Sequence, residues 1–182
     1  MINIRLFIAI NFTPEVKGKL SRVIQELNKE ALRGNFTKTS NLHLTLAFLG
    51  EVSSNRIQDI LKVMNQIFKG KNSFEIKVGG LGKFINREEL LYWCGIQENE
   101  TLTKLQNMLI QGLKAYEFTV DDKPFQPHIT LGRRCKMGLN FDEKEFAKKI
   151  PPINMEVMMI HLMKSENKEG KTIYTSLGEV IL

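Results

Sequence analysis

The feature that most constrains this chain of 182 residues is a strand-like motif that occurs twice in matched surroundings. HLTL occupies residues 43–46 and HITL occupies residues 128–131, although the chain has only three histidines. An apolar run of strand length and a helical pattern precede each motif, and a further helical pattern follows it. This order predicts an internal duplication, with halves at roughly 4–80 and 90–163.

Apolar periodicity and turn residues predict the elements within these halves. Strands are expected at 4–12, 42–50, 74–78, 90–96, 128–134, 153–163 and 171–182, the last two as a hairpin. Helices are expected from Pro14 to a stop at Gly34, from Ser53 or Ser54 to near Gly70, around 102–116, and over 141–150. The expected helix caps are Thr13 and Asp142, and the expected turn contains Gly79, Gly80 and Gly82.

This element order predicts an α+β fold in a single domain over residues 1–182. The duplication predicts two lobes related by a pseudo-twofold axis, with a cleft shared between them. Each lobe would then contribute one His-x-Thr strand to that cleft.

Composition narrows the class of protein and of partner. The formal charge of +6 and the pI near 9.3 favour a polyanionic partner, because lysine and arginine displace counterions from phosphates. No apolar run reaches membrane-spanning length, and the first residues lack the features of a secretory signal. Cys94 and Cys135 have no metal-ligand spacing and are predicted to be two buried thiols in a reducing compartment, the cytoplasm.

The two motifs carry the chemistry that the sequence suggests. Residues two apart on a strand share a face, so His43 and Thr45 point together, as do His128 and Thr130. Two imidazoles supply the acid and the base that metal-free phosphodiester cleavage needs, while two hydroxyls donate to the phosphate oxygens. Arg133 adds a candidate phosphate-binding guanidinium. In a regular strand it would point away from the face of His128 and Thr130, so it needs a strand end or a bulge to reach that face.

Other interpretations of these residues are less favoured than the catalytic one. A lone histidine on an apolar strand is usually a hydrogen-bonded structural residue, but two in matched frames favour a shared function. A zinc site is disfavoured because neither motif has the histidine or cysteine spacing of one. His161 has no repeat partner and is predicted to be structural or exposed, and core packing is predicted for Phe48 and Trp93.

Taken together, the motifs resemble those of the two-histidine phosphoesterases. The similarity is to the RNA 2′,3′-cyclic phosphodiesterase group, historically called 2′-5′ RNA ligases. It is carried by RLFIAI, NLHLTLAFLGEV, GGLGKF, LYWCGI, PFQPHITLGR and SENKEGKTIYTSLGEVIL, which follow in family order along nearly the whole chain.

The resemblance implies a bilobal α+β fold in which two antiparallel sheets line a central cleft and helices cover the outer faces. It implies hydrolysis of 2′,3′-cyclic phosphates on RNA ends or nucleotides to 2′-phosphomonoesters, with 2′-5′ ligation as a minor activity. His43 would be the general acid and His128 the general base. Because the two motifs are alike, each histidine could also take the other role. Thr45, Thr130 and Arg133 would bind substrate, with no metal or cofactor, in a monomer.

Two rival functions remain open at this point. One is a two-histidine esterase for another small cyclic phosphate or a 2′-5′ oligonucleotide. The other is a non-catalytic RNA-binding module, against which the intact His and Thr of both motifs argue.

Overall fold

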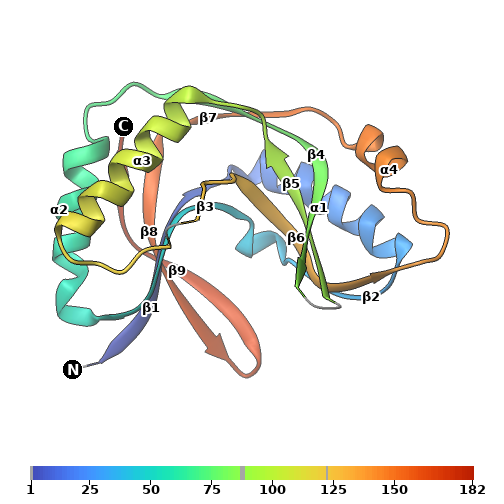
Figure 1. Cartoon of the computed structure of the whole chain (residues 1–182), viewed down its shortest axis with the longest axis horizontal. Helices are drawn as coiled ribbons and strands as arrows, with labels where there is room; N and C mark the ends of the chain where they lie inside the picture. Colours follow the sequence, from blue (N-terminus) through green and yellow to red (C-terminus); the bar gives the residue numbers. More distant parts are fainter. Residues whose placement is uncertain (1, 87–88, 122) are drawn as a thin grey trace.

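The computed structural model of the chain describes residues 2–86, 89–121 and 123–182 (Figure 1). The strands are β1 (Asn3–Asn11), β2 (Ala31–Phe36), β3 (His43–Ser53), β4 (Phe74–Asn86), β5 (Glu89–Ile96), β6 (His128–Met137), β7 (Ile153–Val157), β8 (Met159–Lys168) and β9 (Lys171–Ile181). The α-helices are α1 (Pro14–Glu30), α2 (Ile57–Phe68), α3 (Glu100–Ala115) and α4 (Glu143–Lys149). Short 3-10 turns cover Thr39–Asn41 and Ser54–Arg56.

The strands form two antiparallel sheets, as predicted. The first sheet has the order β3-β1-β8-β9, and the second sheet has the order β2-β6-β5-β4-β7. Each sheet takes strands from both halves of the chain, because β8 joins the first sheet while β2 and β4 join the second. The halves of the sequence therefore do not coincide with the sheets, although each sheet carries one His-x-Thr strand.

The helices cross between the sheets in the same way. Helix α1 follows β1 of the first sheet yet packs against β2, β6 and β7 of the second, whereas α3 follows β5 of the second sheet and packs against α2 and β3. Helix α2 contacts β8 and β9, and α4 contacts β4. In Figure 1, α2 and α3 lie on one side of the molecule and α1 and α4 on the other, so helices cover the outer sides.

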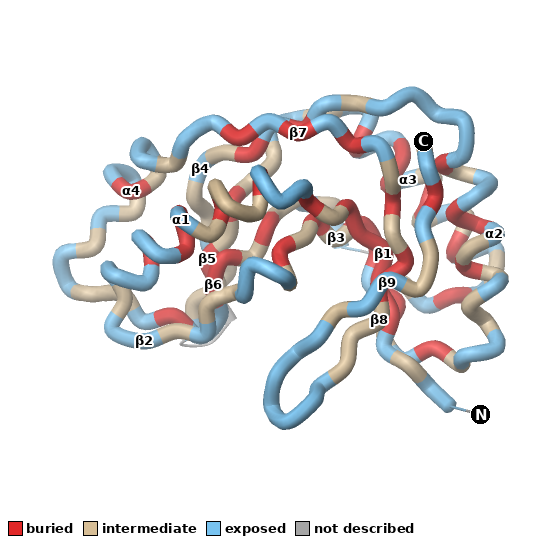
Figure 2. The backbone as a smooth tube through the Cα atoms, turned by 180° about the vertical axis from the view of Figure 1, so that it is seen from behind, coloured by how far each residue is buried: buried red, intermediate tan, exposed pale blue. Residues whose placement is uncertain are grey.

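The alternation of β1 explains how the first sheet is covered on both faces. Leu6, Ile8 and Ile10 belong to the main hydrophobic core, which includes residues of both sheets and all four helices. Phe7 and Ala9 point to the opposite face and form a small separate cluster with Met163. Figure 2 shows the buried centre of the first sheet and the exposed tip of the β8–β9 hairpin.

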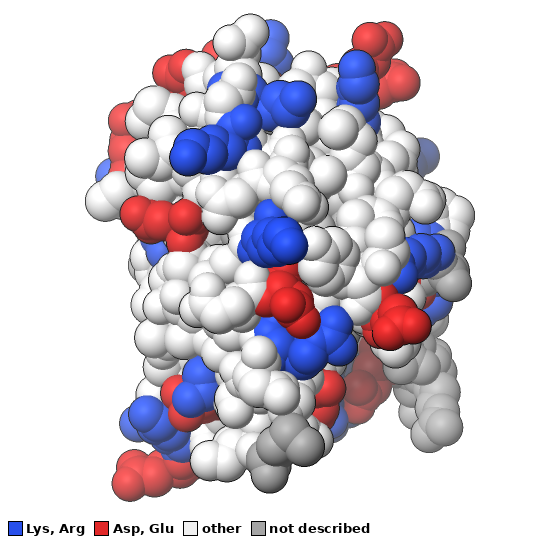
Figure 3. Space-filling view, turned by 90° about the vertical axis from the view of Figure 1, so that its left-hand side faces the viewer, with Lys and Arg blue, Asp and Glu red and all other residues white. Residues whose placement is uncertain are grey.

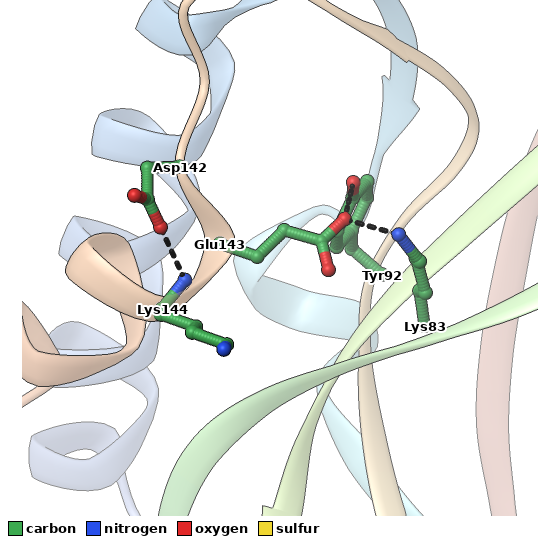
Figure 4. Close-up of polar contacts among 5 residues, drawn as sticks. All are labelled: Lys83, Tyr92, Asp142, Glu143 and Lys144. Carbon is green, nitrogen blue, oxygen red and sulfur yellow. Dashed lines mark hydrogen bonds and ion pairs between the residues drawn. The ribbon is translucent and has the colours of Figure 1, made fainter.

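Helix α4 is anchored to the second sheet through its first residues. The predicted cap is confirmed, because the Asp142 carboxylate accepts hydrogen bonds from the backbone N–H groups of Lys144 and Glu145. The neighbouring Glu143 accepts a hydrogen bond of 2.8 Å from the Tyr92 hydroxyl and pairs with Lys83 (Figure 4). One short helix is thus tied to both β4 and β5.

The start of α1 was predicted correctly, but its end was not. The Thr13 hydroxyl accepts from the Val16 N–H, as expected of the cap. The helix ends at Glu30 rather than Gly34, because the following residues pair with β6 as strand β2. Gly34 lies within that strand, where an added Cβ would meet the Phe36 ring at 2.9 Å, so this glycine serves close packing.

The second helix begins later than the serines predicted. Ser54 opens a 3-10 turn instead, and α2 begins at Ile57 after that turn. The cap position of this turn is Ser53, whose side chain makes no capping hydrogen bond.

The glycine-rich segment expected to be a turn is part of strand β4. Gly80 has a φ of +74°, and the pairing with β5 shifts register between Gly79 and Leu81, so the glycine allows a bulge rather than a chain reversal. Gly82 lies opposite Trp93, where an added Cβ would meet the indole at 2.2 Å. This glycine lets the indole lie over the neighbouring strand.

The strand expected over 153–163 is two strands in different sheets. The chain passes between the sheets at Met158, since β7 pairs with β4 and β8 pairs with β1. The hairpin of β8 and β9 is confirmed, with a turn at Glu169 and Gly170, which have φ values of 52° and 75°. Both cysteines are buried free thiols, as predicted. Among the helices that the structure describes, none has the length and apolar character needed to cross a membrane.

Candidate active site

The two motif histidines lie in one cleft between the sheets. His43 is the first residue of β3 in the first sheet, and His128 is the first residue of β6 in the second. The cleft has a volume of about 340 Å³ and is lined by Arg5, Phe7, Thr37, Asn41, His43, Thr45, Phe48, His128, Thr130, Arg133, Ser165, Thr172 and Tyr174. All five residues singled out in the sequence are in this set, which contains no carboxylate.

Each imidazole is held by a backbone carbonyl two residues earlier in the chain. His43 Nδ1 lies 2.7 Å from the Asn41 carbonyl oxygen, and His128 Nδ1 lies 2.7 Å from that of Gln126. Because a carbonyl only accepts, Nδ1 carries the proton in both rings. The neutral form of each histidine therefore has its lone pair on Nε2, which is available for proton transfer.

Aromatic rings fix and partly dehydrate each imidazole. The His43 ring centre lies 4.8 Å from that of Phe7 and 5.1 Å from that of Tyr174. The rings beside His128 are Phe84 at 5.0 Å and Trp93 at 6.0 Å. Both imidazoles thus have aromatic neighbours on their own sheet, which limits the orientations they can adopt.

Burial lowers the pKa of both histidines. For His43, the positive charges of Arg133 and Lys17 and the neighbouring His128 add to this effect, while the hydrogen bond to Asn41 opposes it. For His128, burial again dominates, the hydrogen bond to Gln126 opposes it, and Arg133 lowers the pKa further. Both rings therefore release their proton more readily than an exposed histidine.

The two threonines of the cleft differ in their hydrogen bonds. Thr45 Oγ1 lies 3.0 Å from His43 Nε2, so its hydroxyl donates to the bare nitrogen of the neutral ring. Within the described part of the chain, the Thr130 hydroxyl and His128 Nε2 make no hydrogen bond. The second motif thus leaves both of these groups open to a ligand.

Arg133 reaches the cleft through a β-bulge. Trp93 pairs with Thr130 and Tyr92 pairs with Gly132, so β6 has one residue more than β5 between these two pairs. A second register shift follows between Gly132 and Cys135, where Arg134 has a φ of 54°. The bulge that the alternation required is present, and Arg133 lines the cleft beside Thr130.

Phe48 occupies the position in the first motif that Arg133 occupies in the second. The core packing predicted for it is wrong, because β3 also shifts register here and the side chain is 44% exposed in the cleft. The Arg5 guanidinium lies 5.0 Å from the centre of the Phe48 ring. Among the described residues that line the cleft, arginines come from both sheets, whereas the aromatic rings of Phe7, Phe48 and Tyr174 all come from the first.

Several cleft residues were missed by the sequence reasoning. They are Arg5, Phe7, Thr37, Asn41, Ser165, Thr172 and Tyr174. Asn41 also donates through Nδ2 to the Thr172 carbonyl at 2.9 Å, which links the β8–β9 hairpin to the start of β3. The sequence near β8 and β9 does not indicate that these strands lie beside the first motif, so their cleft residues could not be predicted. Arg5 and Phe7 could have been predicted to share a face, because alternate residues of a strand such as β1 point the same way.

His161 lies outside the set that lines the cleft, in agreement with the structural role expected for it. Its side chain is 13% exposed, and Nδ1 lies 3.5 Å from a Glu179 carboxylate oxygen. Among the described residues, no group of three or more His, Cys, Asp or Glu comes together as a metal site would require.

Comparison with known proteins identifies relatives over the whole chain. The model of the 2′-5′ RNA ligase superfamily matches residues 16–169. The RNA 2′,3′-cyclic phosphodiesterase of Thermotoga maritima is 36% identical over 176 residues, which cover 96% of this chain and 94% of that protein. The Escherichia coli protein of the same name is 31% identical over 179 residues, which cover 95% and 93%.

Solved structures agree with these relatives. The apo crystal structure of Escherichia coli LigT superposes with a TM-score of 0.80 at 27% identity, covering 100% of this chain and 98% of that one. The structure of LigT complexed with 3′-AMP has a TM-score of 0.78 at 28% identity, covering 100% and 99%. The predicted fold is therefore confirmed.

Proposed function

We infer the function from a family relationship: this chain belongs to the 2′-5′ RNA ligase superfamily. We propose that it is an enzyme that hydrolyses 2′,3′-cyclic phosphates on RNA ends or nucleotides to 2′-phosphomonoesters without a metal, with 2′-5′ ligation, in which a 5′-hydroxyl replaces water as the nucleophile, as a minor activity. The observation that carries this proposal is the pair of imidazoles from opposite sheets, both with Nδ1 hydrogen-bonded to a backbone carbonyl, in one cleft whose lining contains no carboxylate.

In the proposed reaction, His128 acts as the general base and His43 as the general acid. His128 Nε2 takes a proton from water, whose oxygen bonds to phosphorus as the bond from phosphorus to O3′ breaks. Protonated His43 gives its Nε2 proton to O3′, which leaves a 3′-hydroxyl and a 2′-phosphate. The free Nε2 of His128 supports this assignment, because a base must be open to water, whereas His43 Nε2 faces the Thr45 hydroxyl.

The remaining cleft residues would bind the substrate. Arg133 would hold the anionic phosphate through its planar guanidinium, with hydroxyl donors from Thr45 and Thr130. The exposed ring of Phe48 offers a surface on which a base can stack. The face of the molecule formed by α2 and α3 carries basic and acidic side chains interspersed (Figure 3), so the cleft is the better candidate for binding an anion.

We further propose that residues 1–182 work as a single domain and as a monomer in the cytoplasm. Support for the single domain comes from the strands and helices that cross between the sheets, since neither half supplies a complete sheet. One chain supplies both imidazoles of the cleft, and its two thiols are free and buried.

The dependence of activity on pH follows from the lowered histidine pKa values. The base must be neutral and the acid protonated, so kcat/KM should be bell-shaped, with both limbs displaced to lower pH and an optimum below about 6.5. A bound phosphate anion favours the charged imidazolium, so kcat should peak at higher pH than kcat/KM. Steady-state rates between pH 4.5 and 9 measure both profiles, and a flat profile would count against imidazole catalysis.

A substrate panel tests the proposal against its alternatives. The protein, dialysed against EDTA, is incubated with nucleoside 2′,3′-cyclic phosphates, a 3′,5′-cyclic nucleotide and a 2′-5′ linked oligonucleotide. We expect hydrolysis of the 2′,3′-cyclic compounds at the rate seen before EDTA treatment. Hydrolysis of the 3′,5′-cyclic nucleotide or the 2′-5′ oligonucleotide, but not of the 2′,3′-cyclic phosphates, would favour a different esterase. Binding of RNA without turnover would favour the non-catalytic alternative.

A further inference from the structure

Arg5 is a second arginine in the cleft, and the proposed hydrolysis does not use it. It lies on β1, opposite Ser165 of β8 and Glu51 of β3. Its guanidinium lies over the Phe48 ring, 5.0 Å from the ring centre. Arg5 thus brings a second guanidinium to the cleft.

The position of this guanidinium is set by its aromatic neighbour. Arginine keeps its donors in one plane, and stacking on a ring holds that plane while its N–H edges remain free to bind an anion. Phe48 is itself positioned by the register shift of β3, so both groups are fixed before a substrate enters. Such an arrangement lowers the entropy lost when an anion binds.

A cyclic phosphodiester carries one negative charge, for which Arg133 and the two imidazoles already compete. Arg5 projects from the first sheet, whereas Arg133 projects from the second. The two arginines therefore approach a substrate from the two sheets, and together they can contact two of its phosphates. In an RNA end, the second phosphate is the diester on the 5′ side of the terminal nucleotide.

We propose that Arg5 binds the phosphate on the 5′ side of the terminal nucleotide, which makes an RNA end a better substrate than a cyclic mononucleoside phosphate. This inference rests on the proposed function, because it adds a specificity-determining residue to the same cleft. It predicts that one 5′-phosphate is enough to reveal the preference.

The smallest pair of substrates that tests this differs only by that phosphate. Adenosine 2′,3′-cyclic phosphate is compared with its 5′-phosphorylated form, and the ratio of their kcat/KM values is measured. We expect the wild type to prefer the 5′-phosphorylated compound about tenfold, as a charge-assisted hydrogen bond would give. Arg5→Gln should bring this ratio close to one, and Arg5→Lys should give an intermediate ratio.

Arg22→Gln provides a control with the same loss of charge. Arg22 lines a separate cavity beside α1 and α4, so this variant should keep the wild-type ratio. The inference is overturned if Arg5→Gln lowers both kcat/KM values equally, which would make Arg5 a support for Phe48 or a ligand of the reacting phosphate. A ratio unchanged in Arg5→Gln would overturn it as well.

A binding measurement separates failure of this inference from failure of the proposed function. Trp93 is the single tryptophan and lies beside His128, so its fluorescence reports ligands in the cleft without turnover. Adenosine 2′,5′-bisphosphate should bind about tenfold more tightly than the 2′-monophosphate, and Arg5→Gln should abolish that difference. If the wild type hydrolyses neither substrate, the proposed function fails, while equal affinities for the two monitored ligands overturn the role of Arg5.

Discussion

Replacing either cleft histidine by alanine should lower kcat for a 2′,3′-cyclic phosphate by about 10²- to 10⁴-fold, the usual cost of losing a general acid or base. His43→Ala and His128→Ala should have similar effects, because one proton transfer is lost in each. Neither substitution should unfold the protein, since both rings face the cleft while Leu44 and Ile129 enter the core. Steady-state kinetics and thermal unfolding of the same preparations measure the two properties.

His161→Gln is the matched control for these variants. It also removes an imidazole from the chain, but from a position outside the cleft, so its kcat should stay within about twofold of the wild type. Turnover near the wild-type rate in either His43→Ala or His128→Ala would show that paired histidines do not carry the reaction.

Arg133→Ala should lower kcat/KM by about 10- to 100-fold, because it removes a charge-assisted hydrogen bond worth roughly 1.5–3 kcal/mol. A second effect follows from electrostatics. The charge of Arg133 lowers the pKa of both histidines, so its removal should raise both values and move the kcat/KM optimum to higher pH. Kinetics over the full pH range measures both effects.

Arg134→Ala serves as the control for Arg133→Ala. Arg134 is the next residue along β6, but its Nε lies 3.5 Å from a Glu89 carboxylate oxygen and it lines a different cavity. It should keep both the rate and the pH optimum. If Arg133→Ala and Arg134→Ala behaved alike, the effect of Arg133 would be a loss of general surface charge rather than a contact with the phosphate.

The repeat and the strand period were sufficient to predict the paired motifs and most elements. His43 and Thr45 point together because alternate residues on a strand share a face, and their hydrogen bond shows this directly. The exchange of strands and helices between sheets was not predictable, because strand pairing joins residues far apart in sequence. For the same reason β2 was missed, since its polar residues Arg33 and Asn35 find their pairing partners only on β6.

The groups that surround the two histidines were harder still to predict from the nearby sequence. The acceptors at Asn41 and Gln126 are backbone carbonyls, which every residue type supplies. Phe48 lies in an apolar run, which predicts a core residue. The bulge of β3 instead turns its ring into the cleft. Tyr174 reaches His43 from the far strand of a hairpin. These contacts depend on tertiary register, which the sequence pattern does not encode locally.

The identity of the product tests most directly whether this cleft opens a 2′,3′-cyclic phosphate between a fixed acid and a fixed base. A fixed pair can assist the departure of only one ester oxygen for a given orientation of the ribose. The two sides of the cleft differ, because the first motif has Phe48 at the position where the second motif has Arg133. The ribose should therefore bind in a single orientation. After incubation in EDTA, chromatography against 2′- and 3′-monophosphate standards should show the 2′-phosphate, formed as the 3′-oxygen leaves. A product that is mainly the 3′-phosphate, or hydrolysis that stops in EDTA and returns with zinc or manganese, would contradict this account.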